Sequence, residues 1–249
     1  YGQYLTDDQA HVLENQFFTI LKDEKIDGIL LAGDIFDRAV PPIEAVELWD
    51  SIITRLAMDY KVPLFVVSGN HDGAERLEVG RSMLSQSGIH IWGSPHHALQ
   101  PFEFEGPDGK VAICPMPFSE PRRIGDALEQ NIDLNNEATL NLHNYDQMYQ
   151  AWSNHLRNQV PKGMRSIAIS HAFVMGGEVG GSERTLSVGG SEQVNPQVFK
   201  DFHYTALGHL HGPQRMGADY IRYSGSPLKY SFDEYTQKKS FTIIDMDTK

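Results

Sequence analysis

The sequence predicts an α/β fold that is built around a parallel sheet. Two apolar runs, residues 64–67 and residues 29–34 with their closing Gly33-Asp34, are typical of strands covered on both faces. Between them, residues 41–56 carry apolar side chains at helical spacing. A strand, a helix and a second strand in this order predict a right-handed crossover, which places the two strands parallel in one sheet.

The first helix is predicted over residues 7–25, ahead of the first strand. Its apolar side chains recur at helical spacing, and acidic residues at its front and Lys25 at its back complement the helix dipole. The second helix is expected to begin at Pro41 and Pro42, because the fixed φ of proline suits a first helical turn. The elements predicted beyond the second strand are a helix over 75–87, a strand over 89–93, a hairpin over 102–113, polar helices within 121–160, and strands over 166–170, 204–207, 220–223 and 241–246.

Length and composition favour one large domain over residues 1–249, because 40% of the residues are hydrophobic. The single cysteine, Cys114, excludes an internal disulfide framework and favours a reducing, cytoplasmic compartment. No apolar run approaches the roughly 18 residues that span a bilayer, so we expect no membrane segment. The net charge of −12 argues against broad electrostatic binding to nucleic acid, which depends on Lys and Arg. Any affinity for phosphate is therefore expected to be local.

A long loop is predicted over residues 176–191, where glycines and serines separate the third and fourth strands of the predicted sheet. Loops of this length inside a compact domain are usually either functional or disordered. The residues alone leave the role of this loop open.

Side chains that can bind a metal ion follow four of the predicted strands. Because ligands of parallel sheets lie outside the carboxyl ends of the strands, we expect these side chains to converge. Imidazole, carboxylate and amide groups without a thiolate suit ions such as Mn, Fe or Zn. The candidate ligands are Asp34, Asn70, His171, His209 and His211.

Within this set, Asp34 is the candidate that bridges two ions, since a carboxylate has two oxygens. Metal pairs roughly 3.5–4 Å apart activate water and stabilise both oxygens of an in-line phosphoryl displacement. His209 and His211 would normally point to opposite faces of a strand, but a bend at the strand end allows one imidazole on each ion.

The motif that follows the second strand, SGNHDG, also offers a proton donor. His71 can protonate a leaving oxygen, and we expect Asp72 to hold its imidazole. The same four letters GNHD are also compatible with a simple turn. Arg38 is a candidate phosphate contact, for which a solvated surface charge is an equally good interpretation.

The order of five motifs resembles the calcineurin-like metallophosphoesterases, and within them the SbcD-type nuclease subunits of bacteria, relatives of the Mre-type repair nucleases. These motifs are AGDIFDRAVPP, SGNHDGAERL, LSVGGSEQV, ALGHLH and IRYSGSPLKYSF. The resemblance implies a four-layer αββα sandwich of two mixed β-sheets flanked by helices. It also implies two divalent metal ions, usually manganese.

The resemblance further implies a role in DNA repair and recombination. Members of this branch are phosphodiesterases with double-strand exonuclease and single-strand endonuclease activity, and they work as homodimers with an SbcC-type ATPase. Carried over to this sequence, Asn70, His171 and His209 join Asp34 on one ion, Asp34 and His211 hold the other, and His71 is the catalytic imidazole.

The family also has an Asp-X-His motif after its first strand, and we expect that triplet upstream of Tyr1. Hydrolysis is expected to need it, because it completes the ligands of the second ion. Capping and ATPase-docking segments are likewise expected beyond Lys249.

Two other functions remain open on the sequence alone. The first keeps the phosphodiesterase chemistry and replaces DNA by a nucleotide or another small phosphodiester. The second is a catalytically incomplete phosphoesterase fold that serves as a binding scaffold. Turnover of cyclic nucleotides without DNA cleavage favours the first, and a native chain without the Asp-X-His motif favours the second.

Overall fold

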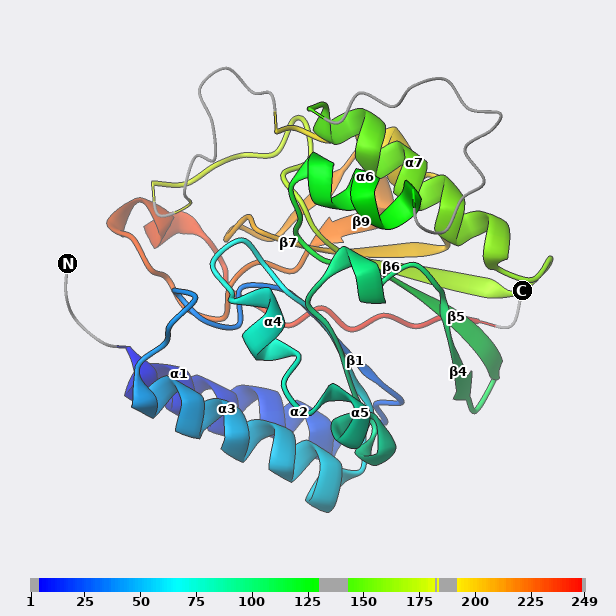
Figure 1. The fold of residues 1–249 in the computed structure, drawn as a ribbon. Helices are drawn as coiled ribbons and strands as arrows, with labels where there is room; N and C mark the ends of the chain where they lie inside the picture. Colours follow the sequence, from blue (N-terminus) through cyan, green and yellow to red (C-terminus); the bar gives the residue numbers. More distant parts are fainter. Residues whose placement is uncertain (1–4, 130–142, 182, 184–191, 248–249) are drawn as a thin grey trace.

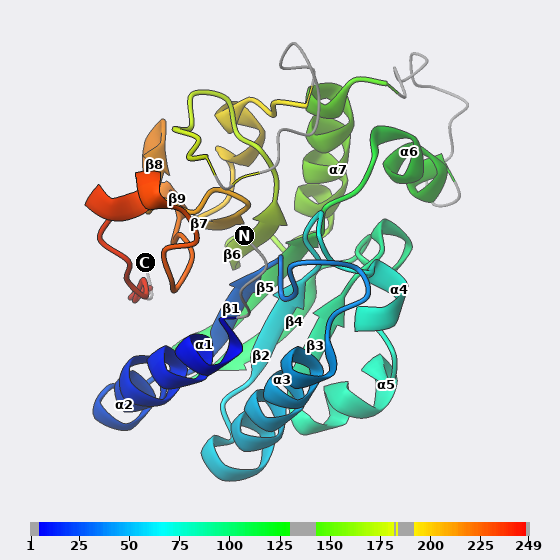
Figure 2. The ribbon, with the colours of Figure 1, turned by 90° about the vertical axis from the view of Figure 1, so that its left-hand side faces the viewer.

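The structure, a computed structural model, describes residues 5–129, 143–181, 183 and 192–247 of the chain. Within these ranges two β-sheets face each other, and helices cover the outer face of each sheet (Figures 1 and 2). This arrangement confirms the predicted αββα sandwich.

The first sheet has three parallel strands in the order β1-β2-β3. Side chains of β2 alternate between two environments, as the two-residue repeat of a strand requires. Leu64 and Val66 pack with the helices, whereas Phe65 and Val67 belong to the core between the sheets. The strands are β1 (Ile29–Ala32), β2 (Leu64–Val67) and β3 (Ile89–Trp92), and the covering helices are α1 (Thr6–Val12), α2 (Phe18–Asp23) and α3 (Ile43–Arg55).

The second sheet has six strands in the order β4-β5-β6-β7-β9-β8. The four central strands run parallel, and β4 and β8 pair antiparallel at the edges. Helices α6 (Pro121–Glu129) and α7 (Tyr145–Gln159) cover its outer face. The strands are β4 (Phe102–Gly106), β5 (Gly109–Met116), β6 (Arg165–His171), β7 (Tyr204–Gly208), β8 (Gln214–Met216) and β9 (Ala218–Tyr223).

Three details of the predicted architecture differ in the described residues. Of the two sheets only the six-stranded one is mixed, because helical segments connect the three strands of the first sheet and return the chain in the same direction. The helix predicted over 75–87 is interrupted at Gly80, which has φ +77° and separates α4 (Ala74–Leu77) from α5 (Arg81–Leu84). A left-handed glycine is a common stop for a helix.

The closing strand predicted over 241–246 is wrong, since no strand is assigned there. The Arg165 guanidinium donates to the carbonyls of Met246 and Asp247 at 2.9 and 2.7 Å, so a side chain binds the backbone at the end of this segment. Ile244 and Met246 still pack against the inter-sheet core, which explains the apolar pattern.

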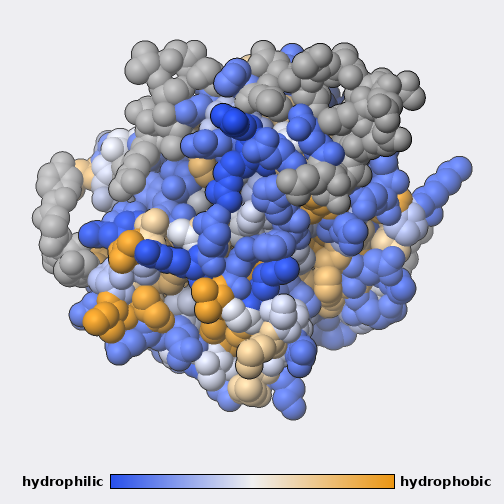
Figure 3. All heavy atoms as spheres, viewed as in Figure 1, coloured by the Kyte–Doolittle hydropathy of each residue, from blue (hydrophilic) through white to orange (hydrophobic). Residues whose placement is uncertain are grey.

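The surface is mostly hydrophilic in the view of Figure 3, with some apolar spheres near the start of α3. Exposed apolar side chains at the start of α3 and just before it are Val40, Ile43 and Val46. Within the described part of the chain, no helix combines the length and the apolar character that a membrane crossing requires.

Candidate metal centre

Four strand ends, two from each sheet, meet at one edge of the sandwich. The first residues beyond β1 and β2 carry Asp34 and Asn70, β6 ends in His171, and His209 follows β7 directly. β6 and β7 are in register here, with His171 opposite Gly208. The side chains are therefore brought together by the parallel arrangement that the sequence predicted.

Gly208 lets the two sheets approach each other beside these ligands. A Cβ atom at this position would lie 1.7 Å from the carbonyl oxygen of Ala32 in β1, a distance that no side chain tolerates. A second glycine, Gly69, allows a close approach within the first sheet, since its Cβ would lie 2.0 Å from Oδ1 of Asp34. Two glycines therefore make room for the close contacts at this corner of the molecule.

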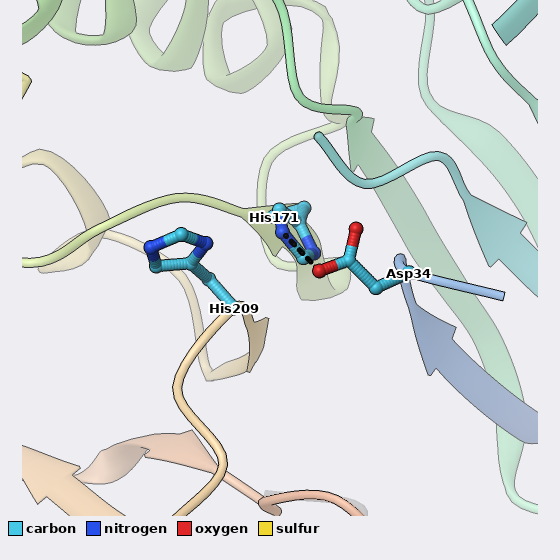
Figure 4. Close-up of side chains that lie close together, drawn as sticks. All are labelled: Asp34, His171 and His209. Atoms are coloured by element: carbon cyan, nitrogen blue, oxygen red, sulfur yellow. Dashed lines mark ion pairs between the residues drawn. The ribbon is translucent and has the colours of Figure 1, made fainter. Parts of the chain in front are cut away.

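Asp34, His171 and His209 form a compact cluster of possible metal ligands. One atom of each lies within 4.8 Å of the others, and Figure 4 shows the Asp34 carboxylate directed toward the His171 ring. Nε2 of His171 is 3.4 Å from Oδ2 of Asp34. Asn70 joins them, because its Oδ1 lies 2.9 Å from Nε2 of His171 and 3.0 Å from Nδ1 of His209. Four of the five predicted ligands thus converge.

The hydrogen bond on the far side of His171 defines the character of this pocket. Nδ1 of His171 lies 2.8 Å from the carbonyl oxygen of Ala32. A carbonyl only accepts, so Nδ1 carries the hydrogen and Nε2 of the neutral ring holds a lone pair. That lone pair faces two further acceptors, Oδ1 of Asn70 and Oδ2 of Asp34. A cation satisfies such a group of acceptors, and the donor set fits Mn, Fe or Zn.

Among the described residues, three other than glycine have a positive φ, and two of them, Asp34 and His209, are candidate ligands; the third is Lys61. Asp34 has φ +50° and His209 has φ +113°, values that side-chain-bearing residues rarely adopt. Strain of this kind costs on the order of 1–3 kcal/mol per residue and is found mainly at functional sites. In both cases the turn follows the end of a strand, and the side chain belongs to the compact cluster.

Burial and nearby charges keep the Asp34 carboxylate and the His209 ring in the protonation states that metal binding requires. Burial lowers the pKa of His209 to about 3, and the neighbouring His171 adds to the effect, so the ring is neutral at pH 7. Burial acts to raise the pKa of Asp34, but the His171 and His71 rings and the His71 backbone amide outweigh it. The net pKa of Asp34 is lowered, and its carboxylate is ionised.

His211, the fifth predicted ligand, is not a member of the compact cluster among the described residues. Its Nδ1 lies 3.0 Å from Oε1 of Glu234, and its backbone amide donates to Oε1 of Glu183 at 2.9 Å. Its role on a second ion stays a prediction.

The prediction that Asp72 holds the His71 imidazole is wrong in the described structure. Asp72 accepts hydrogen bonds from three backbone amides, those of Ile35, Phe36 and Gly69, at 2.8–3.2 Å. Its short side chain turns inward and joins the loop after β1 to the loop after β2. Burial raises the pKa of Asp72, although the amides of Gly69 and Phe36 oppose the shift.

His71 is held instead by Asp37. Nδ1 of His71 lies 2.9 Å from the backbone carbonyl of Asp37 and 3.9 Å from its Oδ1, while the His71 amide donates to Oδ1 of Asp34 at 3.0 Å. The ring is 16% exposed and lies beside the pocket. Asp37 was not predicted from the sequence, where its only signal is a second acid three residues after Asp34 in GDIFDR.

Arg38 lies at the surface, where its side chain is 55% exposed and pairs with Asp37 at 3.2 Å. A contact with phosphate remains a prediction for this residue. Most of the loop predicted over 176–191 lies outside the described residues.

The family model for calcineurin-like phosphoesterases matches residues 6–213 of the chain. The chain belongs to this family. Two curated relatives both carry the name of the SbcD component of the SbcCD nuclease. The protein from Bacillus subtilis is 36% identical over 98% of this chain, and that from Staphylococcus epidermidis is 30% identical over 99%. The chain spans 62% of the length of each relative. The phosphoesterase family is defined by hydrolytic, metal-dependent chemistry, which agrees with the cluster of acceptors described above.

Proposed function

We propose that residues 1–249 form the nuclease domain of a metal-dependent enzyme that hydrolyses phosphodiester bonds in DNA. The observation that carries this proposal is the convergence of a carboxylate, an amide oxygen and two imidazole rings at one pocket. Membership in the phosphoesterase family and the nuclease names of the two relatives support the choice of reaction.

Two divalent ions belong to the proposal, and the ligand chemistry favours manganese. Asp34, Asn70, His171 and His209 would hold one ion. Asp34 and His211 would hold the other, together with an Asp-X-His motif upstream of Tyr1. When bound, such a pair polarises the phosphate and supplies a nucleophilic water at neutral pH.

His71 is the proposed proton donor to the leaving oxygen. Its Nδ1 donates to the carbonyl of Asp37, which fixes the ring and leaves Nε2 as the nitrogen that exchanges a proton. The Asp72 carboxylate accepts from three backbone amides and so holds the loop of His71 against the loop of Asp34. Its contribution is therefore to position the loops.

The proposed partners are DNA, an SbcC-type ATPase and a second copy of the chain, in the cytoplasm, with double-strand exonuclease and single-strand endonuclease activity in repair and recombination. The exposed apolar side chains at the start of α3 and just before it, Val40, Ile43 and Val46, support a homodimer. The net charge of −12 predicts weak, local binding of DNA by this domain alone.

The test is cleavage of linear DNA by the full-length protein with Mn²⁺, alone and with its ATPase partner. Asp34→Ala and His71→Ala are expected to abolish cleavage, as is removal of metal by a chelator. Arg215→Ala, in an exposed ion pair with Asp219, is the control and should cleave normally. Undiminished cleavage by both site variants would refute the assigned roles. Hydrolysis of cyclic nucleotides without any DNA cleavage would change the substrate, and no turnover of either would favour a binding scaffold.

A further inference from the structure

A network of side chains from the segment after β9 holds His211. Nδ1 of His211 lies 3.0 Å from Oε1 of Glu234, which is fully buried. The other carboxylate oxygen, Oε2, is 2.6 Å from Nζ of Lys239 and also accepts from the backbone amide of Tyr230 at 3.2 Å. Both oxygens of Glu234 therefore have defined partners, and one of them is the imidazole.

Lys239 connects the same carboxylate to the backbone of His211. Its Nζ donates to the His211 carbonyl at 2.8 Å, to Oγ of Ser226 at 2.8 Å and to Oε1 of Gln237 at 2.7 Å. The His211 carbonyl also accepts from the backbone amide of Ser226 at 3.0 Å. Ring and backbone of His211 are thus fixed by one connected network.

Stability alone is a weak reason for such a network. Removing two charges from water is costly, and buried ion pairs can often be replaced by apolar residues without loss of stability. The network does, however, define the tautomer of His211. A carboxylate oxygen only accepts, so Nδ1 of His211 carries the hydrogen and the lone pair of the neutral ring lies on Nε2. Imidazoles that bind metal ions commonly have this arrangement, with an outer carboxylate on the other nitrogen.

We infer that Glu234 is the positioning residue for His211, fixing its tautomer and ring orientation for a metal ion, and that Lys239 in turn holds Glu234. The Tyr230 ring, whose centroid lies 5.5 Å from that of the His211 ring at an interplanar angle of 69°, limits rotation of the imidazole further. The inference rests on the proposed function, in which His211 is a metal ligand. It assigns a role in the site to residues 230–239, which follow the last described strand.

The first measurement concerns the tautomer of His211 in the metal-free, full-length protein at neutral pH. Nitrogen-15 NMR of the histidine side chains distinguishes a ring with its hydrogen on Nδ1 from one with the hydrogen on Nε2. The wild-type ring is expected to carry the hydrogen on Nδ1, and Glu234→Gln is expected to yield a mixture of both forms. A wild-type His211 with its hydrogen on Nε2 overturns the inference, however the variants behave.

The second measurement is Mn²⁺ binding, followed by electron paramagnetic resonance. Glu234→Gln is expected to weaken one of two Mn²⁺ sites by about 10–100-fold and to leave the other unchanged, as loss of an outer carboxylate does in other metal sites. Glu78→Gln is the matched control, because Glu78 is also a buried acid with a histidine partner, but that histidine is His97, which is not a candidate ligand. It should retain both sites.

The two measurements separate this inference from the proposed function. Loss of one Mn²⁺ site in His211→Ala, together with intact sites and an unchanged tautomer in Glu234→Gln, contradicts the role of Glu234 alone. Two unchanged Mn²⁺ sites in His211→Ala contradict the ligand role of His211, and with it the proposed second ion.

Discussion

The two halves of the candidate site are built in different ways. Asp34, His171 and His209 follow strand ends directly, and backbone groups fix the His171 ring through the carbonyl of Ala32. His211 depends on a carboxylate, Glu234, and an ammonium, Lys239, from a segment that comes after the sheet. The arrangement of the first half is therefore expected to be disrupted when the backbone is displaced. That of the second half is expected to be disrupted when a single side chain is removed.

The largest effect is expected in the second half. Lys239→Met removes the ammonium and leaves the fully buried Glu234 without its cation. Breaking a buried ion pair in this way typically costs about 3–5 kcal/mol, because one charge stays buried and uncompensated. Urea denaturation of the metal-free protein measures the loss. The double variant Lys239→Met/Glu234→Leu should recover much of it, and a loss that the second change does not reduce would contradict the pairing.

A smaller loss of stability is expected from Gly208→Ala in the first half. The new methyl group would meet the carbonyl of Ala32, so β7 and β1 must separate, at a cost of roughly 1–3 kcal/mol or more. Gly163→Ala is the control. It has no atom within 4 Å of the added methyl and only the strain of φ +82°, about 1 kcal/mol. Equal losses in the two variants would show that close approach of the sheets is unimportant.

The pH dependence of stability tests the electrostatics of the first half. Because burial lowers the pKa of His209 from 6.5 to about 3, the unfolded chain binds a proton that the folded chain does not between these values. The free energy of unfolding should therefore fall by about 1.4 kcal/mol per unit as the pH drops below 6.5. His209→Asn, measured by urea denaturation with a chelator present, should show a slope smaller by this amount. Identical slopes would contradict a buried, neutral His209.

The smallest effect is expected from Arg38→Ala, which touches neither half directly. Its exposed ion pair with Asp37 should contribute less than about 1 kcal/mol to stability. If Arg38 contacts phosphate, its loss would lower the salt dependence of DNA binding by about one counterion. Fluorescence titration of labelled DNA at several salt concentrations distinguishes that result from an unchanged slope, which would assign Arg38 to the solvated surface.

The difference between the halves also explains what the sequence could predict. The run 64–67 coincides with β2, because a short apolar stretch that is rich in β-branched and aromatic residues favours a buried strand over a helix. Four ligands were predicted for the same reason, since each follows an apolar run directly. Parallel strands then bring them to one edge of the molecule.

Contacts that depend on the direction of a loop were not predictable in this way. Asp72 is adjacent to His71 in sequence, yet its carboxylate turns to three backbone amides, and Asp37 holds the His71 ring. Glu234 lies 23 residues from His211, and no periodic pattern connects the two. The segment 241–246 has the composition of a strand, but the Arg165 guanidinium binds the carbonyls at its end.

The contact between Gly208 and the Ala32 carbonyl has a consequence for how this protein can change. Main-chain atoms set the spacing of the layers at the pocket, so side chains elsewhere in the interior do not determine how far apart the ligands stand. Substitutions there would alter how firmly the layers adhere and leave the dimensions of the pocket as they are. Extensive divergence of the interior, as between chains that share only 30–36% of their residues, is therefore compatible with an unchanged spacing of the candidate metal ligands.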